Sequence, residues 1–245
     1  MSFIRVFSRA HFGMDAPLVI VEAHLSRGLP CFSIVGLPET AVRESRDRVR
    51  SAIIEAGFDF PRQRVTVNLA PADLPKEGGR YDLAIAIGIL LCTQQIESNK
   101  IPNLEFLGEL GLSGSIRPIP GVLPAVLASR LEQRTLLIPF ANSLEASLVR
   151  EANVFTAQHL SEVIQYLTSE TNLPMVTYQP PEAPDFESDW SEVVGQPHAK
   201  RALEIAVAGG HHALLVGPPG SGKTMLAQRI PTIMSDLSEE QALEV

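Results

Sequence analysis

Cysteine is scarce in this sequence of 245 residues, since only Cys31 and Cys92 occur, far apart and among apolar neighbours. Neither belongs to a CxxC pair, which argues against a metal site or a disulfide framework. Both are expected to be reduced residues of the core. The six histidines are scattered, and the adjacent pair His211 and His212 lacks the spacing of a metal-ligand set, which favours structural or solvated roles.

Long apolar runs are also lacking. The longest, Leu83 to Cys92, is interrupted by Gly88 and has about half the length that a membrane span needs. The first residues show neither the apolar core nor the small-residue cleavage site of a signal peptide. A cytoplasmic location is the resulting expectation.

Positive charge is in deficit, with 20 lysines and arginines against 28 acidic residues and a net charge of -8. The chain as a whole therefore has no general attraction for nucleic acid, although a local basic patch is not excluded. A hydrophobic content of 45% and a charged content of 20% are typical of a soluble globular protein. The length allows one large domain or two smaller ones.

The first section, residues 1–168, alternates strand-like and helix-like patterns, which predicts an α/β (α+β) domain. Arg64 to Ala70, for example, alternates apolar and polar residues, whereas the apolar residues of 39–56 recur at helical spacing. The predicted strands are 18–25, 31–35, 64–70, 135–139 and 154–157, with a turn at 36–38 and a hairpin over 104–118. The predicted helices are 39–56, 82–96, 122–132, 143–151 and 160–167.

A proline-rich and acidic stretch, residues 169–188, follows and is unsuited to forming a core, so we interpret it as a linker. The second section, residues 189–245, is predicted to be α/β again. A helix is expected over Lys200 to Ala208, or from His198, and a strand over His212 to Val216. A further helix is expected from about Lys223 to Arg229. Trp190 is expected to pack at the start of this domain.

A glycine-rich loop carries the strongest functional pattern. Gly217, Gly222, Lys223 and Thr224 match G-x-x-x-x-G-K-[ST] in full. Glycines let backbone N–H groups turn toward a phosphate, and the dipole of the following helix adds to the attraction. Lys223 would reach the β- and γ-phosphates, and the Thr224 hydroxyl would bind magnesium. The predicted nucleotide-binding residues are Gly217, Pro218, Pro219, Gly220, Ser221, Gly222, Lys223 and Thr224.

A chance match in a glycine-rich turn is the alternative, but the expected strand before the loop and helix after it favour a phosphate site. No apolar run ending in paired acids follows the loop, and no sensor residue or arginine finger is evident. The second domain is therefore expected to be truncated. We expect this chain to bind ATP weakly at best and not to hydrolyse it.

Charged residues of the 39–56 helix permit two interpretations. A DNA-facing patch is one, and a solvated face with Glu39–Arg43 and Glu44–Arg48 pairs is the other, which the nearby acids favour. No aromatic residues interleave with these charges, which argues against a stacking site for single strands. The basic residues concerned are Arg43, Arg46, Arg48 and Arg50, which Arg62, Arg64 and Lys76 could extend. Asp73 is expected in a loop and Asp82 at a helix start, rather than as a catalytic pair.

Four long stretches carry a family resemblance: FSIVGLPETAVRESRDRVRSAIIEAGFDFP (32–61), VTVNLAPADLPKEGGRYDLAIAIGIL (65–90), FLGELGLSGSIRPIPGVLPAVLASR (106–130) and GQPHAKRALEIAVAGGHHALLVGPPGSGKT (195–224). In this order they resemble the ComM family, also called magnesium-chelatase-like or YifB-like. The resemblance covers almost the whole chain. It implies an N-terminal domain similar to the proteolytic domain of Lon, followed by an AAA+ ATPase domain.

The resemblance also implies partners and an activity. Members are linked to natural transformation as homo-hexameric, ATP-driven motors that promote branch migration of recombining DNA, with ATP and magnesium as cofactors. In the AAA+ superfamily the Val-Gly-Gln stretch lies beside the adenine, which would place Val194 and Gly195 there. An ordinary helix cap is the alternative for these two residues.

Lon-type peptidases use a serine–lysine dyad, in K-D-G-P-S-A-G and G-G-L-K patterns. The matching stretches here put Arg80 at the serine position and Leu123 at the lysine position. Neither side chain supports that chemistry, so the fold is expected without proteolysis. Arg80 is expected to be a surface charge rather than a contact to a partner. Two rival functions are a chelatase subunit acting on porphyrin and a non-enzymatic oligomerisation or partner-binding scaffold.

Overall fold

The computed structural model describes residues 2–36, 40–169, 171–180, 186–238 and 241–242, without the side chains of Ser2 and residues 40–43. The chain divides into two compact units, Met1–Pro180 and Pro181–Val245. The division falls inside the stretch 169–188 that the sequence marks as a linker. Each unit is described by itself below.

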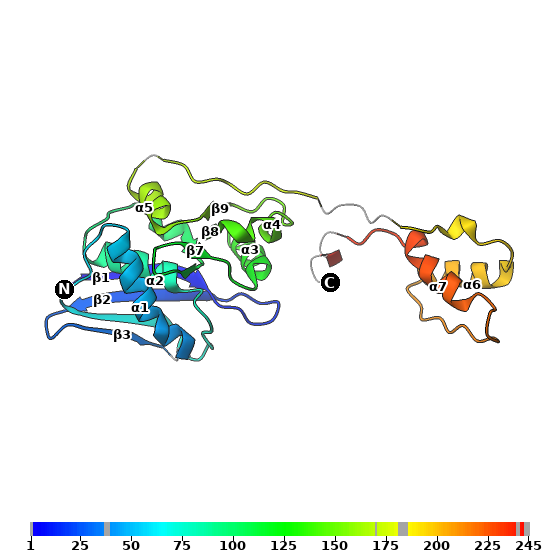
Figure 1. The fold of residues 1–245 in the computed structure, drawn as a ribbon, viewed down its shortest axis with the longest axis horizontal. Coiled ribbons are helices and arrows are strands. Elements are labelled where there is room, and N and C mark those ends of the chain that lie inside the picture. Colours follow the sequence, from blue (N-terminus) through cyan, green and yellow to red (C-terminus); the bar gives the residue numbers. More distant parts are fainter. Residues whose placement is uncertain (1, 37–39, 170, 181–185, 239–240, 243–245) are drawn as a thin grey trace. The chain divides into compact units, whose positions relative to one another are not determined.

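A central sheet organises unit 1 (Figure 1). Its strand order is β3-β4-β2-β1-β5-β8-β9, seven strands among the described residues. β1–β2 and β2–β4 pair antiparallel, whereas β1–β5, β3–β4, β5–β8 and β8–β9 pair parallel. The mixed α/β class predicted from the sequence is confirmed. The strands are β1 (Ser2–Arg9), β2 (Leu18–Ser26), β3 (Cys31–Val35), β4 (Arg64–Ala70), β5 (Leu104–Phe106), β8 (Thr135–Pro139) and β9 (Val154–Ala157).

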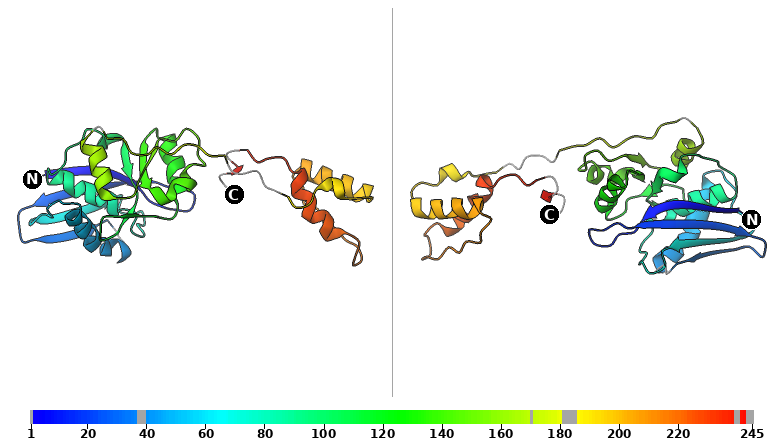
Figure 2. Two further views of the ribbon diagram at one scale, coloured as in Figure 1. Left: turned by 45° about the horizontal axis from the view of Figure 1, so that its top comes forward. Right: turned by 180° about the vertical axis from the view of Figure 1, so that it is seen from behind.

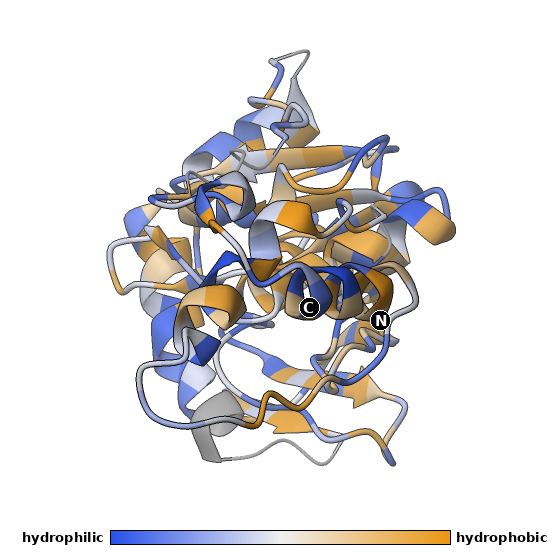
Figure 3. Ribbon diagram, turned by 90° about the vertical axis from the view of Figure 1, so that its right-hand side faces the viewer, coloured by the Kyte–Doolittle hydropathy of each residue, from blue (hydrophilic) through white to orange (hydrophobic). Residues whose placement is uncertain are grey.

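Alternation along the strands explains which residues are buried. In β4 the side chains of Val65, Val67 and Leu69 are buried and their neighbours are more exposed. Figure 3 shows this alternation as bands of hydrophobic and hydrophilic colour along the strands. Seen from behind in Figure 2, β1 and β2 have no helix over them, so the helices α1 and α2 cover the opposite face.

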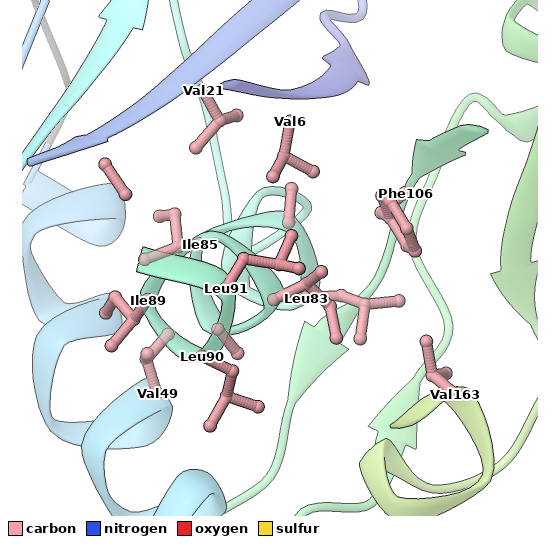
Figure 4. Packing of buried hydrophobic residues seen from close by; sticks show 14 of the residues in the cluster. Val6, Val21, Val49, Leu83, Ile85, Ile89, Leu90, Leu91, Phe106 and Val163 are labelled. Atoms are coloured by element: carbon pink, nitrogen blue, oxygen red, sulfur yellow. The ribbon is translucent and has the colours of Figure 1, made fainter. Parts of the chain in front are cut away.

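Helix α2 (Asp82–Cys92) is buried along its whole length. It packs between the sheet and α1 (Thr40–Glu55), as Figure 4 shows for Ile85, Ile89 and Leu90. A helix that is apolar all round can only be stable with neighbours on every side, which the sheet and α1 supply. The other helices of unit 1 are α3 (Val122–Leu131), α4 (Ser143–Ala146) and α5 (Leu160–Thr168).

Strand β1 was not among the strands predicted from the sequence, and its last residue is a charged side chain in the core. Arg9 is 1% exposed, and its Nε donates to Glu105 Oε2 at 2.6 Å, while Arg134 Nε donates to Glu105 Oε1 at 2.6 Å. Burial lowers the pKa of Arg9, but hydrogen bonds to Glu105 and Glu132 outweigh it and raise the pKa overall. The partner carboxylate lies 96 residues away, so local patterning gave no sign of it.

Several predicted boundaries need correction. Helix α2 ends at Cys92 instead of residue 96, since Gln94 takes a positive φ of 57° that a helix does not allow. The helix predicted over 143–151 is reduced to α4. The predicted hairpin forms between β6 (Glu109–Leu110) and β7 (Ile116–Arg117), while β5 joins the main sheet instead. Residues 37–39, part of the predicted turn and helix start, lie outside the described residues.

The longer helices in the described part of unit 2 are α6 (Pro197–Ala208) and α7 (Lys223–Arg229), and short 3-10 helices occur at Trp190–Glu192 and Ile230–Ile233. Trp190, Val193, Leu203 and Leu226 form its small core, which confirms that Trp190 packs at the start of this section. The strand predicted over His212 to Val216 is wrong. This stretch has no strand pairing with any described residue, and a strand without a neighbour leaves its backbone hydrogen bonds unmade.

The described residues contain no helix long and apolar enough to cross a membrane and no cluster of potential metal ligands. Cys92 is buried as expected. Cys31 is exposed, contrary to the expectation, because it begins β3 at the edge of the sheet.

Candidate nucleotide-binding site

The loop of residues 217–222 leads directly into helix α7, which begins at Lys223. Gly220 and Gly222 have φ angles of 78° and 83°, in the left-handed region that glycine adopts without strain. These two turns bend the chain back over itself within a few residues. Gly222, a fixed glycine of the motif, and Gly220, at a variable position, therefore allow the tight backbone that a phosphate-binding loop requires.

The side chain of Lys223 curls back over this loop. Its Nζ donates to the carbonyl oxygens of Gly217 and Pro218, each at 2.8 Å, and lies 3.3 Å from Ser221 Oγ. The ammonium group is thus held at the mouth of the loop by weak neutral acceptors. An anionic phosphate is a stronger acceptor for a charged donor than a carbonyl, so a ligand can replace these bonds. The residues present fit a bound phosphate group.

Thr224, the expected magnesium ligand, follows Lys223 on the first turn of α7 and is exposed. The residues before the loop are open as well, with Leu214 88% and Val216 86% exposed. The eight motif residues therefore lie together as one solvent-accessible loop and helix start.

Gln196 links the preceding segment to the loop. Its side-chain amide donates to the carbonyl of Ser221 at 3.1 Å, and a Cβ on Gly222 would lie 2.8 Å from the same amide nitrogen. Gln196 directly follows Val194 and Gly195, the residues expected beside the adenine. Val194 itself is 91% exposed, and Gly195 has a positive φ of 78°. Gln196 was not among the predicted site residues, although it completes the Val-Gly-Gln stretch.

Comparison with known proteins identifies the family. A family described as subunit ChlI of Mg-chelatase matches residues 21–142, and one described as magnesium chelatase, subunit ChlI, matches residues 189–245. Competence protein ComM of Haemophilus influenzae is 49% identical over 249 residues, covering 100% of this chain and 49% of that protein. The chain belongs to the ComM/YifB family. As a member it is AAA+ ATPase-like.

Other relatives in this family extend the match. YifB of Escherichia coli K12 is 46% identical over 244 residues, covering 100% of this chain and 48% of that protein. An uncharacterized protein of Mycobacterium tuberculosis H37Rv is 43% identical over 246 residues, covering 100% of this chain and 49% of that protein. The chain spans about half the length of the curated relatives that it matches.

In this ComM/YifB chain, Arg80 is not the surface charge that we expected. It is 5% exposed, and its NH2 group donates to the carbonyls of Pro120 and Gly121 at 3.2 and 3.3 Å. Burial lowers the pKa of Arg80. Gly121 lies two residues before Leu123, so the segments that hold the two dyad positions are in contact. The guanidinium of Arg80 and the carbonyls of Pro120 and Gly121 make this contact.

Helix α1 has the expected solvated face at Glu44, Arg46, Asp47 and Arg50, which are exposed, but Arg48 differs. Arg48 turns inward, and its Nε donates to Asp82 Oδ2 at 2.7 Å, whereas a pair with Glu44 was expected. Asp82 is fully buried at the start of α2 and also accepts the N–H of Leu110 at 3.2 Å. Burial raises the pKa of Asp82 to about 6, against the lowering effect of Arg48. This pair ties α1 to α2.

Proposed function

We propose that this chain is the ATP-binding portion of an AAA+ DNA motor, one that promotes branch migration in homologous recombination during natural transformation. The observation that carries the proposal is the Lys223 ammonium held over the glycine turns of residues 217–222. Similarity to a relative named competence protein ComM supports competence as the process, and recombination is what the family resemblance implies.

The chemistry follows from the loop residues. Backbone N–H groups of residues 217–224 would cradle the phosphates of ATP, and Lys223 would offset their negative charge. The Thr224 hydroxyl would hold the magnesium ion that accompanies ATP. Gln196, through its bond to Ser221, keeps the loop beside Val194 and Gly195, where the adenine would lie.

Hydrolysis requires more than this loop. A water must be oriented and the developing charge neutralised, which in P-loop ATPases is the work of acidic residues and an arginine from other segments. We propose that the chain alone binds nucleotide without turning it over. In the motor, homo-hexamer formation would bring such groups together.

Unit 1 is proposed to be Lon-like without peptidase activity. Arg80 stands where the serine of the dyad is expected and donates to Pro120 and Gly121. A guanidinium committed to two carbonyls is neither a nucleophile nor a general base.

The test is ATP hydrolysis by the full-length protein, with and without a four-way DNA junction. Junction-stimulated hydrolysis is expected, and Lys223→Ala should abolish it. The matched control is Arg201→Ala, which removes a cation that is 73% exposed on α6 and should leave hydrolysis unchanged. Absence of hydrolysis with and without DNA would overturn the motor proposal and leave a binding scaffold.

A chelatase subunit is the second candidate, because the matching families carry that description. The same assay separates the two candidates when a porphyrin replaces the junction. Stimulation by porphyrin and none by DNA would favour the chelatase. Stimulation by the junction alone favours the DNA motor.

A further inference from the structure

A basic hollow lies on unit 1, between helix α1 and strand β3, which are neighbours in Figure 1. It has a volume of about 680 Å³. Three arginines line it, and they come from two separate segments: Arg46 and Arg50 from α1, and Arg62 from the residues before β4. In a chain with a net charge of -8, this is a local concentration of positive charge.

Phenylalanines line the same hollow. Phe58 and Phe60 come from the segment after α1, and Phe32 comes from β3. The rings of Phe32 and Phe60 lie 5.5 Å apart between centroids, and the guanidinium of Arg50 lies 5.5 Å from the centroid of Phe60. All three rings are only partly buried. No aromatic residue interleaves with the arginines of α1, but Phe58 and Phe60 are followed at the same spacing by Arg62 and Arg64. This corrects the expectation that no aromatic residue interleaves with these charges.

A second hollow of about 460 Å³ adjoins the first. The two share Pro61, Arg62 and Gln63, so Arg62 lies where they meet. Arg62 has no hydrogen-bond or ion-pair partner in the described part of the chain. Two adjoining hollows that share Arg62 offer more length than a single small anion needs, which favours a polymer.

Charge at the rim favours an anionic ligand. Asp47 and Asp59 also line the hollow, so its three arginines exceed its acids by one. Arg64 directly follows Gln63, and its Cα pairs with those of Ser26 and Cys31 at the same end of the sheet. Arg64 is exposed, and it adds positive charge beside the opening.

We propose that this hollow binds a single strand of nucleic acid. The arginines would contact successive phosphates, and the phenyl rings would stack on bases, which is the combination that single-strand sites use. A duplex fits the observations less well, because its bases are already stacked and offer no free face to the rings. The proposal rests on the proposed function only for the choice of nucleic acid over an acidic peptide.

The first experiment measures binding of a fluorescein-labelled oligothymidylate of about 15 nucleotides to the chain of residues 1–245 by anisotropy. The triple variant R46Q/R50Q/R62Q should weaken binding at least tenfold. The slope of log Kobs against log salt should fall by about 2, since each phosphate contact contributes about 0.7. The control R5Q/R117Q/R201Q removes the same charge from side chains that are 59–73% exposed elsewhere, and should change binding less than twofold.

A second experiment tests the rings separately from the charge. Phe60→Leu keeps an apolar side chain in place but removes the stacking face. Affinity should fall by about tenfold with the salt slope unchanged. The exposed thiol of Cys31 lines the hollow, so the oligonucleotide should slow its reaction with a thiol reagent.

Equal losses in the triple variant and its control would overturn the proposal, as would an unprotected Cys31. Displacement of the oligonucleotide by polyglutamate at equal charge concentration would point to an acidic peptide instead and would also overturn it. Lys223→Ala should bind the oligonucleotide like the unmodified chain. Loss of oligonucleotide binding in the triple variant therefore supports the hollow as the binding site, even if the full-length protein shows no junction-stimulated hydrolysis. Junction-stimulated hydrolysis with no effect of the triple variant on binding would overturn the hollow alone.

Discussion

Leu90 and Leu214 both lie in apolar stretches, yet Leu90 is fully buried in unit 1 whereas Leu214 is 88% exposed in unit 2. Leu90 belongs to a helix enclosed by a sheet and a second helix. Leu214 precedes the phosphate loop, where the described part of unit 2 supplies no strand to pair with. The difference teaches that an apolar run predicts burial only where its neighbours in space are present.

The largest expected effect tests the interior of unit 1. Glu105→Gln removes the carboxylate that serves both Arg9 and Arg134, and leaves the buried Arg9 with Glu132 as its remaining carboxylate partner among the described residues. Breaking a buried pair in this way should lower the free energy of unfolding by about 4 kcal/mol, measured by urea denaturation. The surface pair gives the control, since Glu22→Gln, opposite Arg5, should cost less than about 1 kcal/mol. If both substitutions lower the free energy of unfolding by similar amounts, Glu105 is not part of a buried ion-pair network that stabilises the core.

The next largest effect comes from making the same leucine-to-alanine substitution in both units. Leu90→Ala should cost about 3 kcal/mol because it leaves a cavity. Leu214→Ala should change stability by less than about 0.5 kcal/mol, as at other exposed positions. The single tryptophan, Trp190, reports on unit 2, and all three tyrosines lie in unit 1, so fluorescence separates the two transitions. A large cost for Leu214→Ala would indicate that the stretch is buried.

A pH dependence follows from Asp82. Its pKa is about 6 in the folded chain, above the ordinary value of 3.8, because of burial. The folded state therefore holds this proton more tightly than the unfolded state. The contribution of Asp82 to stability is full below about pH 4 and falls by at most about 1.4 kcal/mol per pH unit as pH rises toward 6.

Asp82→Asn isolates this contribution. As pH rises from about 4 to about 6, the unfolding free energy of the unmodified chain should fall relative to that of Asp82→Asn. Urea denaturation across that range measures it. If the unmodified chain instead gains stability relative to Asp82→Asn over this range, the ion pair with Arg48 outweighs burial and lowers the pKa of Asp82.

The smallest expected effect lies in unit 2. Gln196→Ala removes one exposed hydrogen bond to Ser221, so magnesium-ATP affinity should fall by about threefold. Gln228→Ala, on the exposed side of α7, is the control and should leave affinity unchanged. Isothermal titration measures both. Equal affinities for the two variants would mean that Gln196 does not position the loop.

Much of the fold could be predicted from local patterns. The strand over Arg64–Ala70 was predicted with its observed bounds, because its alternation matches a half-buried strand. Helix α5 was also found to within one residue. The apolar spacing of Leu83–Cys92 gave α2, although its end at Cys92 depends on the backbone conformation of Gln94.

What could not be predicted depends on distant partners. Strand β1 ends in Arg9, whose burial makes sense only with Glu105 beside it. Arg80 looked like a surface charge because the carbonyls that accept from it lie about forty residues further along the chain. The candidate phosphate loop was recognisable because its chemistry is contained in eight consecutive residues. The basic hollow was not, because Arg46 and Arg50 come from α1 and Phe32 from β3, while its other rings and arginine lie in the segment before β4.

Binding of magnesium-ATP to this chain tests the central claim most directly. Titration calorimetry on the unmodified chain should detect weak binding that requires magnesium, and Lys223→Ala should reduce the affinity at least tenfold by removing a charged donor to phosphate. Arg201→Ala should leave affinity unchanged. Equal binding by the unmodified chain and Lys223→Ala would contradict the assignment of residues 217–224 as the phosphate site.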